Sequence, residues 1–147
     1  MTNETLIHPV EKYKEYITQA YGVPNKIWYP LSGFHIGTDY ACPDNTLVKA
    51  PIGGEVITAG KSRSLGNYCH YQYAYKGQVY VERWLHLSII PKIGEYKQNE
   101  TVAITGGTGR VTGDHLHQDI WLDEVRLDLI NSKNWRELTI NPQTHYK

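Results

Sequence analysis

Residues 67–87 read NYCHYQYAYKGQVYVERWLHL, and this stretch decides the fold class. It is rich in aromatic and β-branched residues on both sides of Lys76-Gly77, and two such runs joined by a short glycine-containing connection are typical of a β-hairpin. We therefore expect one strand over 67–75 and a second, antiparallel to it, over 78–87.

Further strand-like runs surround this hairpin. We expect them at 34–40, 47–50, 54–58, 101–105 and 115–122. Apolar residues at helical spacing predict a short N-terminal helix over 9–21, ended by Gly22 and Pro24. Residues 123–131 fit a helical turn or a loop equally well.

The predicted architecture is mainly β. We expect an antiparallel β-sheet or sandwich-like domain with an open groove and a short N-terminal helix. Residues 1–28 form the predicted helical extension, packed on a domain over 29–147, and the whole is one domain.

Composition excludes several classes of function. The 147 residues carry 15 Lys plus Arg against 15 Asp plus Glu, so the formal net charge is +0. That balance disfavours nucleic acid or an anionic membrane as a partner.

The N-terminus lacks a basic start and an apolar run, so we expect no signal peptide and synthesis in a cytoplasm. Cys42 and Cys69 fit two buried thiols better than a single bridge.

The first motif with chemistry is His35-Ile-Gly-Thr-Asp39. Its glycine, threonine and nearby proline disfavour a helix, and in a strand an even separation places His35, Gly37 and Asp39 on one face. An imidazole and a carboxylate with room between them suit zinc, although the motif alone also fits a polar surface strand.

A second motif is His115-Leu-His117, with Asp119 next on the same face of the predicted strand. One imidazole of the pair can bind a metal while the other faces the same cavity unbound. Asp119 is a candidate acceptor for a histidine N–H behind the metal. Alone, these residues also fit a solvated polar face.

The third motif is Trp84-Leu-His-Leu-Ser88, where His86 interrupts an apolar run. A catalytic zinc takes three protein ligands and keeps one position for water, whose pKa it lowers towards neutrality. His35, Asp39 and one of the His115/His117 pair would supply one such zinc per chain. His86 and the other member of the pair could then orient the water and stabilise an oxyanion, as amide hydrolysis requires.

Together these motifs resemble those of the lysostaphin-type zinc metalloendopeptidases, which cleave peptide bonds in bacterial peptidoglycan. The shared segments lie in the family's order from Tyr29 to the C-terminus. They are His35-Ile-Gly-Thr-Asp39, Ala41-Cys-Pro-Asp-Asn-Thr46, Ala50-Pro51, Gly66-Asn-Tyr68, Trp84-Leu-His-Leu-Ser88, the run from Gly106 to His117, and Asn141-Pro142.

The resemblance implies zinc ligands at His35, Asp39 and His117, and unligated catalytic histidines at His86 and His115. It also implies a β-sheet groove in which a peptidoglycan peptide lies across the zinc. Some members place a tyrosine before the first ligand to hold the oxyanion, and Tyr29 lies in that region.

The sequence departs from the family's pattern at a few turns. Asn45 and Asn99 stand where glycine is usual, and asparagine tolerates the left-handed backbone best after glycine. Asp114 stands in place of a common proline. None of these changes removes an implied ligand.

Two alternatives differ in function. One is a non-catalytic component of a virion tail that keeps the fold and only holds peptide. The other is a structural zinc site, which would close the fourth position with a protein ligand. A catalytic domain without an evident leader resembles phage lysins or virion-associated hydrolases. We therefore expect action at the bacterial wall after release or on a virion, with phage tail proteins as candidate partners.

Overall fold

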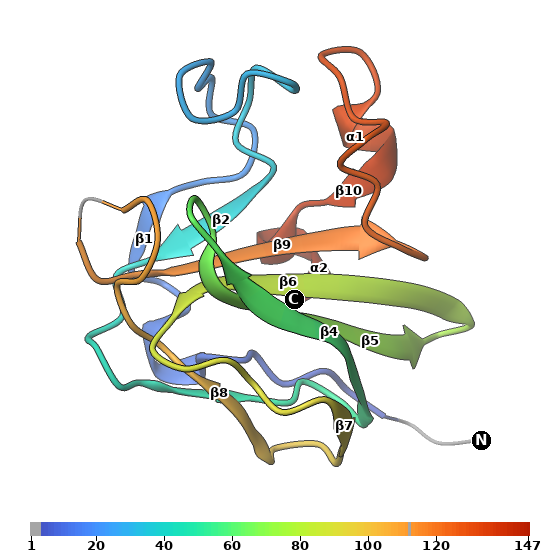
Figure 1. The fold of residues 1–147 in the computed structure, drawn as a ribbon. Coiled ribbons are helices and arrows are strands. Elements are labelled where there is room, and N and C mark those ends of the chain that lie inside the picture. The colour runs from blue at the N-terminus through green and yellow to red at the C-terminus, as the bar shows by residue number, and fades with distance from the viewer. Residues whose placement is uncertain (1–3, 112) are drawn as a thin grey trace.

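A computed structural model describes residues 4–111 and 113–147 (Figure 1). Over these residues an eight-stranded antiparallel sheet has the order β1-β2-β9-β6-β5-β4-β7, with β10 paired to β9, and a two-stranded sheet pairs β3 with β8. The strands are β1 (Ile17–Gln19), β2 (Gly37–Tyr40), β3 (Leu47–Lys49), β4 (Gly54–Ser62), β5 (Gly66–Tyr75), β6 (Gln78–Leu87), β7 (Gly94–Tyr96), β8 (Thr101–Ile104), β9 (Leu116–Leu122) and β10 (Thr139–Ile140). The prediction of a mainly β, antiparallel domain is confirmed.

The hairpin of β5 and β6 is the one expected from residues 67–87. Tyr75 pairs with Gln78, and both connecting residues have positive φ, 49° at Lys76 and 79° at Gly77. This backbone matches the right-handed twist of the flanking strands. Asn45 and Asn99 also have positive φ, 67° and 71°, so asparagine does support the left-handed turns in place of glycine.

The large sheet has a hydrophobic core on each of its two faces. Figure 1 shows the elements that cover them: the small β3–β8 sheet on one side and helix α1 (Trp135–Leu138) on the other. On one face, Tyr71, Trp84 and Leu87 pack against residues of the small β3–β8 sheet. On the other face, Trp121 packs with Ile36 and Trp135 beneath the segment before β2 and helix α1. Alternation along β9 therefore directs Leu116 into the first core and Trp121 into the second.

The predicted helix over 9–21 is wrong for most of its length. Only Glu11–Tyr13 form a helix, a single 3-10 turn, and Ile17–Gln19 form strand β1 instead. Strand β1 pairs with the edge of β2, where Gln19 faces Asp39. The sheet edge offers this segment backbone hydrogen bonds and β-branched packing, while an isolated helix of this length is marginal in water.

The C-terminal segment contains elements that the sequence did not predict. Helix α1, strand β10 and helix α2 (Pro142–His145) follow one another, and residues 123–131 form turns. Asn141 caps α2, because its side-chain oxygen accepts the backbone N–H of Gln143. This segment ties the chain end to β9.

Cys42 and Cys69 are both buried and do not form a disulfide, which agrees with the prediction of two buried thiols. Within the part of the chain that the structure describes, no helix has the length and apolar character needed to cross a membrane.

Gly37 fixes the approach of β2 to β9, and its replacement gives a first prediction. A Cβ at this position would lie 2.2 Å from the Gln118 carbonyl oxygen and 2.9 Å from the Asp119 Cβ. We expect Gly37→Ala to lower the free energy of unfolding by about 3 kcal/mol, the upper end of overpacking costs, measured by urea denaturation. Gly53→Ala is the control, because its Cβ would meet its nearest atom at 3.8 Å. Equal midpoints for both variants would contradict this account.

Candidate metal centre and active site

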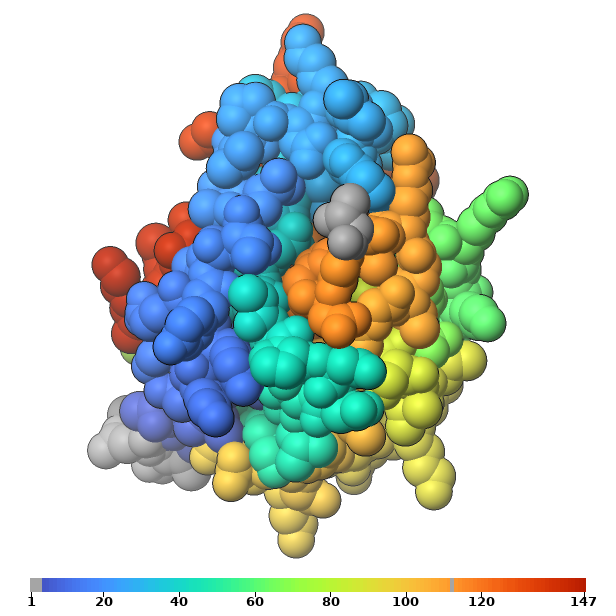
Figure 2. Space-filling model, turned by 90° about the vertical axis from the view of Figure 1, so that its left-hand side faces the viewer, coloured from blue at the N-terminus to red at the C-terminus, as the bar shows by residue number. Residues whose placement is uncertain are grey.

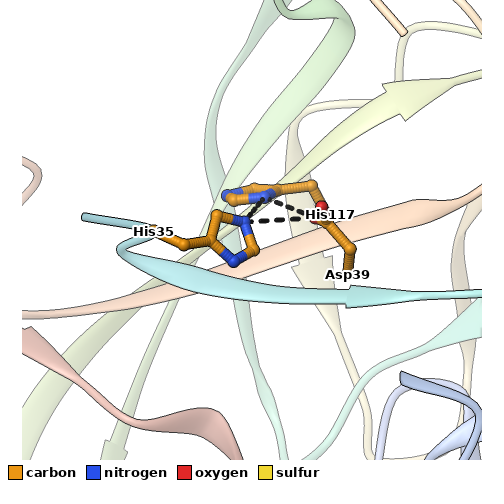
Figure 3. A group of neighbouring side chains, drawn as sticks. All are labelled: His35, Asp39 and His117. Atoms are coloured by element: carbon orange, nitrogen blue, oxygen red, sulfur yellow. Dashed lines mark hydrogen bonds and ion pairs between the residues drawn. The ribbon is translucent and has the colours of Figure 1, made fainter. Parts of the chain in front are cut away.

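Two side chains of one motif, His35 and Asp39, converge with His117, 78 residues after Asp39, at the β2–β9 pair (Figure 3). Asp39 lies directly opposite His117 in the strand register, and His35 precedes β2. His117 Nδ1 lies 2.8 Å from Asp39 Oδ1 and 3.2 Å from His35 Nε2, and His35 Nε2 lies 3.4 Å from Asp39 Oδ1. Donors of a tetrahedral zinc site lie about 3.3 Å apart at ordinary bond lengths. This group could therefore hold a metal ion.

The hydrogen bonds of the two imidazoles define which nitrogen of each is available. His35 Nδ1 lies 3.1 Å from the Ala20 carbonyl oxygen, which can only accept, so Nδ1 carries the proton and Nε2 is left for a metal. His117 uses the opposite nitrogens, because its Nε2 lies 2.8 Å from Asp119 Oδ2 and its Nδ1 faces Asp39. Strand β1 is essential here, since Ala20 follows it directly.

The charges of the cluster also suit a cation. Burial opposes the charged form of His117, yet hydrogen bonds to Asp119 and Asp39 raise its pKa to about 9. Burial likewise opposes ionisation of Asp39, but hydrogen bonds from His117 and His35 hold the pKa of its carboxyl well below the usual range. Without a metal, a proton on His117 satisfies the flanking carboxylates, and a bound cation would replace that proton.

A buried ion pair stands behind His117. Arg83 lies opposite Asp119 in the β6–β9 register, and its Nε and Nη2 donate to the two carboxylate oxygens at 2.9 Å and 2.7 Å. Trp121 Nε1 donates a further hydrogen bond to Asp119 at 2.7 Å. Burial opposes ionisation, but Arg83 and His117 keep the pKa of Asp119 well below its usual value. Asp119 is thus a fixed acceptor for His117.

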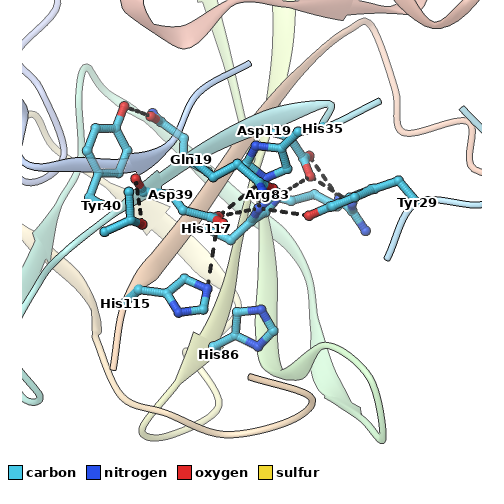
Figure 4. A network of polar contacts seen from close by, with 12 residues as sticks. Gln19, Tyr29, His35, Asp39, Tyr40, Arg83, His86, His115, His117 and Asp119 are labelled. Atoms are coloured by element: carbon cyan, nitrogen blue, oxygen red, sulfur yellow. Dashed lines mark hydrogen bonds and ion pairs between the residues drawn. The ribbon is translucent and has the colours of Figure 1, made fainter. Parts of the chain in front are cut away.

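His86 and His115 lie side by side on the other side of His117 (Figure 4), with ring centroids 5.0 Å apart. His86 donates from Nδ1 to the Thr108 carbonyl and His115 from Nδ1 to the Gly113 carbonyl, at 2.9 Å and 3.0 Å. Burial, with the nearby His117, lowers the pKa of His86 to about 4, so His86 is neutral at pH 7. Both residues therefore carry their proton on Nδ1 when neutral.

The backbone of His86 has a positive φ of 61°, which is uncommon for a residue other than glycine. Its N–H donates to the Leu65 carbonyl at 2.9 Å, and the two buried leucines that flank it face the core. This conformation at the end of β6 presents the imidazole to the cavity. Such strained positions cluster at functional sites.

Tyr29 also reaches this centre. Its hydroxyl lies 3.3 Å from His117 Nδ1, and its ring packs edge-on against His35 with centroids 5.0 Å apart. Burial raises the pKa of Tyr29, so its hydroxyl stays protonated and can donate a hydrogen bond.

A cavity of about 150 Å³ opens above the cluster. Its described lining residues come from four segments: Gln19, Asn25, Trp28, Tyr29, Asp39, His86, Arg110, Val111, His115 and His117. Figure 2 shows this face of the molecule, where the loop before β9, in orange, meets the segment before β2, in blue. The cavity has room for a few heavy atoms of a ligand next to Asp39, His86, His115 and His117, and His35 lies buried behind this lining.

Comparison with known proteins agrees with this arrangement. Residues 33–129 match the model of peptidase family M23. The chain belongs to this family. The peptidoglycan DD-endopeptidase ShyB of Vibrio cholerae is 33% identical over 149 residues, covering 95% of this chain and 33% of that protein. The DD-carboxypeptidase/endopeptidase Mpg of Neisseria meningitidis is 33% identical over 86 residues, covering 58% of this chain and 19% of the relative. The M23 chain thus spans a third or less of these relatives.

Solved structures share the M23 fold. A zinc-containing peptidase from Vibrio cholerae superimposes with a TM-score of 0.71 at 28% identity, over 98% of this chain and 40% of that one. The catalytic domain of lysostaphin from Staphylococcus simulans has a TM-score of 0.71 at 23% identity, over 92% of both chains. The resemblance inferred from the motifs is confirmed for family and fold.

Sequence reasoning missed several residues of this M23 site. Arg83 lies in a strand of aromatic and apolar residues, and a charge at such a position is the signal that was available. Its partner could not be inferred, because the pairing of β6 with β9 joins residues 36 positions apart. Trp28 and Arg110 were not singled out either, since neither lies at a motif position of known chemistry.

A second buried carboxylate supports β9 from its other face. Glu82 accepts hydrogen bonds from Tyr73 at 2.6 Å, Gln118 at 2.7 Å, Trp84 at 3.1 Å, and Tyr146. Burial raises the pKa of Glu82, and these four donors act in the opposite direction. The network joins the C-terminus to the residue next to His117, which helps to fix the register of β9.

Proposed function

We propose that this chain is a zinc-dependent endopeptidase that hydrolyses peptide bonds in the stem or cross-bridge of bacterial peptidoglycan. The observation that carries the proposal is the convergence of His35 Nε2, Asp39 Oδ1 and His117 Nδ1 beneath a cavity that His86 and His115 also line. Three protein ligands beside open space are typical of catalytic rather than structural zinc sites. Membership of family M23 and its similarity to peptidoglycan DD-endopeptidases support the substrate class.

His35, Asp39 and His117 would hold one zinc ion per chain, which supplies a Lewis acid and makes water a competent nucleophile at neutral pH. Asp119 would orient His117, because it accepts the Nε2 proton and is itself held by Arg83. No covalent bond between enzyme and substrate is needed.

His86 and His115 would act on protons and charge. Each has Nδ1 tied to a backbone carbonyl, so each directs Nε2 as the working atom. Neutral His86 can accept the proton of the attacking water at Nε2, and His115, when it also carries a proton on Nε2, can donate from that atom to the developing oxyanion or the leaving amine. Tyr29, whose hydroxyl stays protonated, is proposed as a further oxyanion donor.

The experiment for this proposal measures metal and products separately. We expect one zinc per chain by mass spectrometry under native conditions and new amino termini after incubation with purified cell walls. Chelation should remove both the metal and the activity, and zinc should restore them. Zinc bound without new amino termini would favour the non-catalytic tail component, and absence of zinc binding would remove the metal from the proposal.

The biological setting is a further proposal. A role as a phage lysin or a virion-associated hydrolase, made in a host cytoplasm and acting at the wall, rests on the sequence pattern alone. Infection experiments that detect the protein in lysates or in purified virions test it directly.

A further inference from the structure

Arg110 and Trp28 meet at the wall of the cavity, one from each of the two loops that flank it. The Arg110 guanidinium carbon lies 4.7 Å from the centroid of the Trp28 ring, and both residues line the cavity with His86 and His115. Building on the proposed function, we propose that Arg110 binds a free carboxylate of the peptide substrate next to the scissile amide. Arg110 is thereby a specificity-determining residue.

The guanidinium is oriented but not satisfied. Among the described residues, no carboxylate lies within ion-pair distance of Arg110, and no protein acceptor takes a hydrogen bond from its guanidinium. Its backbone N–H is used, because it donates to the Ser64 carbonyl at 2.9 Å and fixes the loop. A guanidinium over an aromatic face is held there by cation–π attraction, and its N–H donors stay available for a planar, bidentate partner.

Charge around the cavity points to the same ligand chemistry. The carboxylate in the described lining, Asp39, is engaged by His117 and His35, and the remaining lining groups apart from the histidines and Arg110 are uncharged. Arg63 lies beyond Arg110, and the two arginines line a neighbouring hollow together. A substrate that extends past Arg110 therefore meets positive charge, because the described residues that line this hollow include two arginines and no carboxylate.

The positive charge of Arg110 should distinguish between two classes of wall peptide. Cross-links between stem peptides can carry a free carboxylate beside the scissile amide, whereas a glycine bridge has no side-chain carboxylate at all. Arg110 would gain a charged hydrogen-bond pair only with the first class. The chain is therefore assigned to carboxylate-bearing stem cross-links in preference to glycine bridges.

The test uses two synthetic cross-linked stem peptides that differ only in a carboxylate or its carboxamide beside the scissile amide. We expect the zinc-loaded chain to cleave the carboxylate peptide with the higher kcat/KM. Arg110→Gln should lower that value about 10- to 100-fold, mainly through KM, as expected for the loss of one charged hydrogen-bond pair. The value for the carboxamide peptide should stay nearly constant, and Arg110→Lys should retain part of the preference.

Arg136→Gln is the matched control. Arg136 stacks on Trp135 with 4.6 Å between the guanidinium carbon and the ring centroid, but it does not line the cavity. It should keep the wild-type preference. Equal kcat/KM for both peptides, or an equal loss on both in Arg110→Gln, would overturn the carboxylate site and leave the endopeptidase proposal intact.

Binding of the two peptides is measured as well, because it tests the carboxylate site even when no cleavage is detected. Trp28 is 42% exposed while Trp84, Trp121 and Trp135 are buried, so tryptophan fluorescence reports on the Arg110 wall. If neither peptide is cleaved, the proposed function fails. Tighter binding of the carboxylate peptide that disappears in Arg110→Gln would still support the site, and equal binding of both peptides would overturn it.

Discussion

His117→Ala should lose both zinc and hydrolysis, whereas His115→Ala should keep the zinc and lose hydrolysis. The difference follows from distance. His117 Nδ1 lies 2.8 Å from Asp39 Oδ1, while His115 Nε2 lies 4.0 Å from the same atom and has its other nitrogen tied to Gly113. Loss of an outer-shell partner costs roughly 10- to 100-fold in metal affinity, and loss of His117 itself should cost more. For His115→Ala we expect a decrease in kcat of about 10²- to 10⁴-fold.

Zinc titration monitored by thermal unfolding checks the metal part. A ligand present at 100 times its Kd stabilises the folded state by about 2.7 kcal/mol, so zinc should raise the melting temperature of the wild type and of His115→Ala but not of His117→Ala. His70→Ala is the control, because His70 lies on β5 outside the cavity lining and should change neither readout. If His115→Ala loses zinc and His117→Ala keeps it, the roles within the pair are reversed.

Arg83→Met should destabilise the fold more than any surface substitution. Arg83 and Asp119 are 3% and 0% exposed, and two short hydrogen bonds join them. Removing the guanidinium leaves a buried carboxylate without its ion-pair partner, at a cost of about 3–5 kcal/mol. For a chain of this size that lowers the melting temperature by roughly 10 °C, measurable by calorimetry. Lys14→Met, which removes an exposed ion pair with Glu11, should melt like the wild type.

A double variant separates stability from positioning. Arg83→Met combined with Asp119→Leu removes both buried charges, and an apolar pair of similar volume should recover most of the lost stability. Zinc affinity should stay reduced, because His117 Nε2 then has no acceptor to hold its ring. Full recovery of zinc affinity in the double variant would show that Asp119 does not orient His117. A wild-type melting temperature for Arg83→Met would contradict the role of the ion pair.

The hairpin and the motif residues were predictable because their signals are local. The aromatic and β-branched runs on both sides of Lys76-Gly77 can be recognised from neighbouring residues alone, and β5 and β6 form as expected. Spacing placed His35 near Asp39 and His117 near Asp119. The helix expected over 9–21 failed because apolar spacing does not reveal that the edge of β2 is available to pair with β1.

The sequence alone determined the fold class, the family and the residue types at the centre, since turns, alternation and motif order are written in short segments. The tertiary structure alone decided how they act together. Antiparallel pairing set Asp39 against His117 and Arg83 against Asp119, and strand β1 delivered the Ala20 carbonyl that directs His35. It also brought the Arg110 guanidinium over the Trp28 ring at the wall of the cavity. These contacts join residues 15 to 82 positions apart in the sequence. They depend on which strands pair and on how the loops pack, and no short stretch of sequence reveals either.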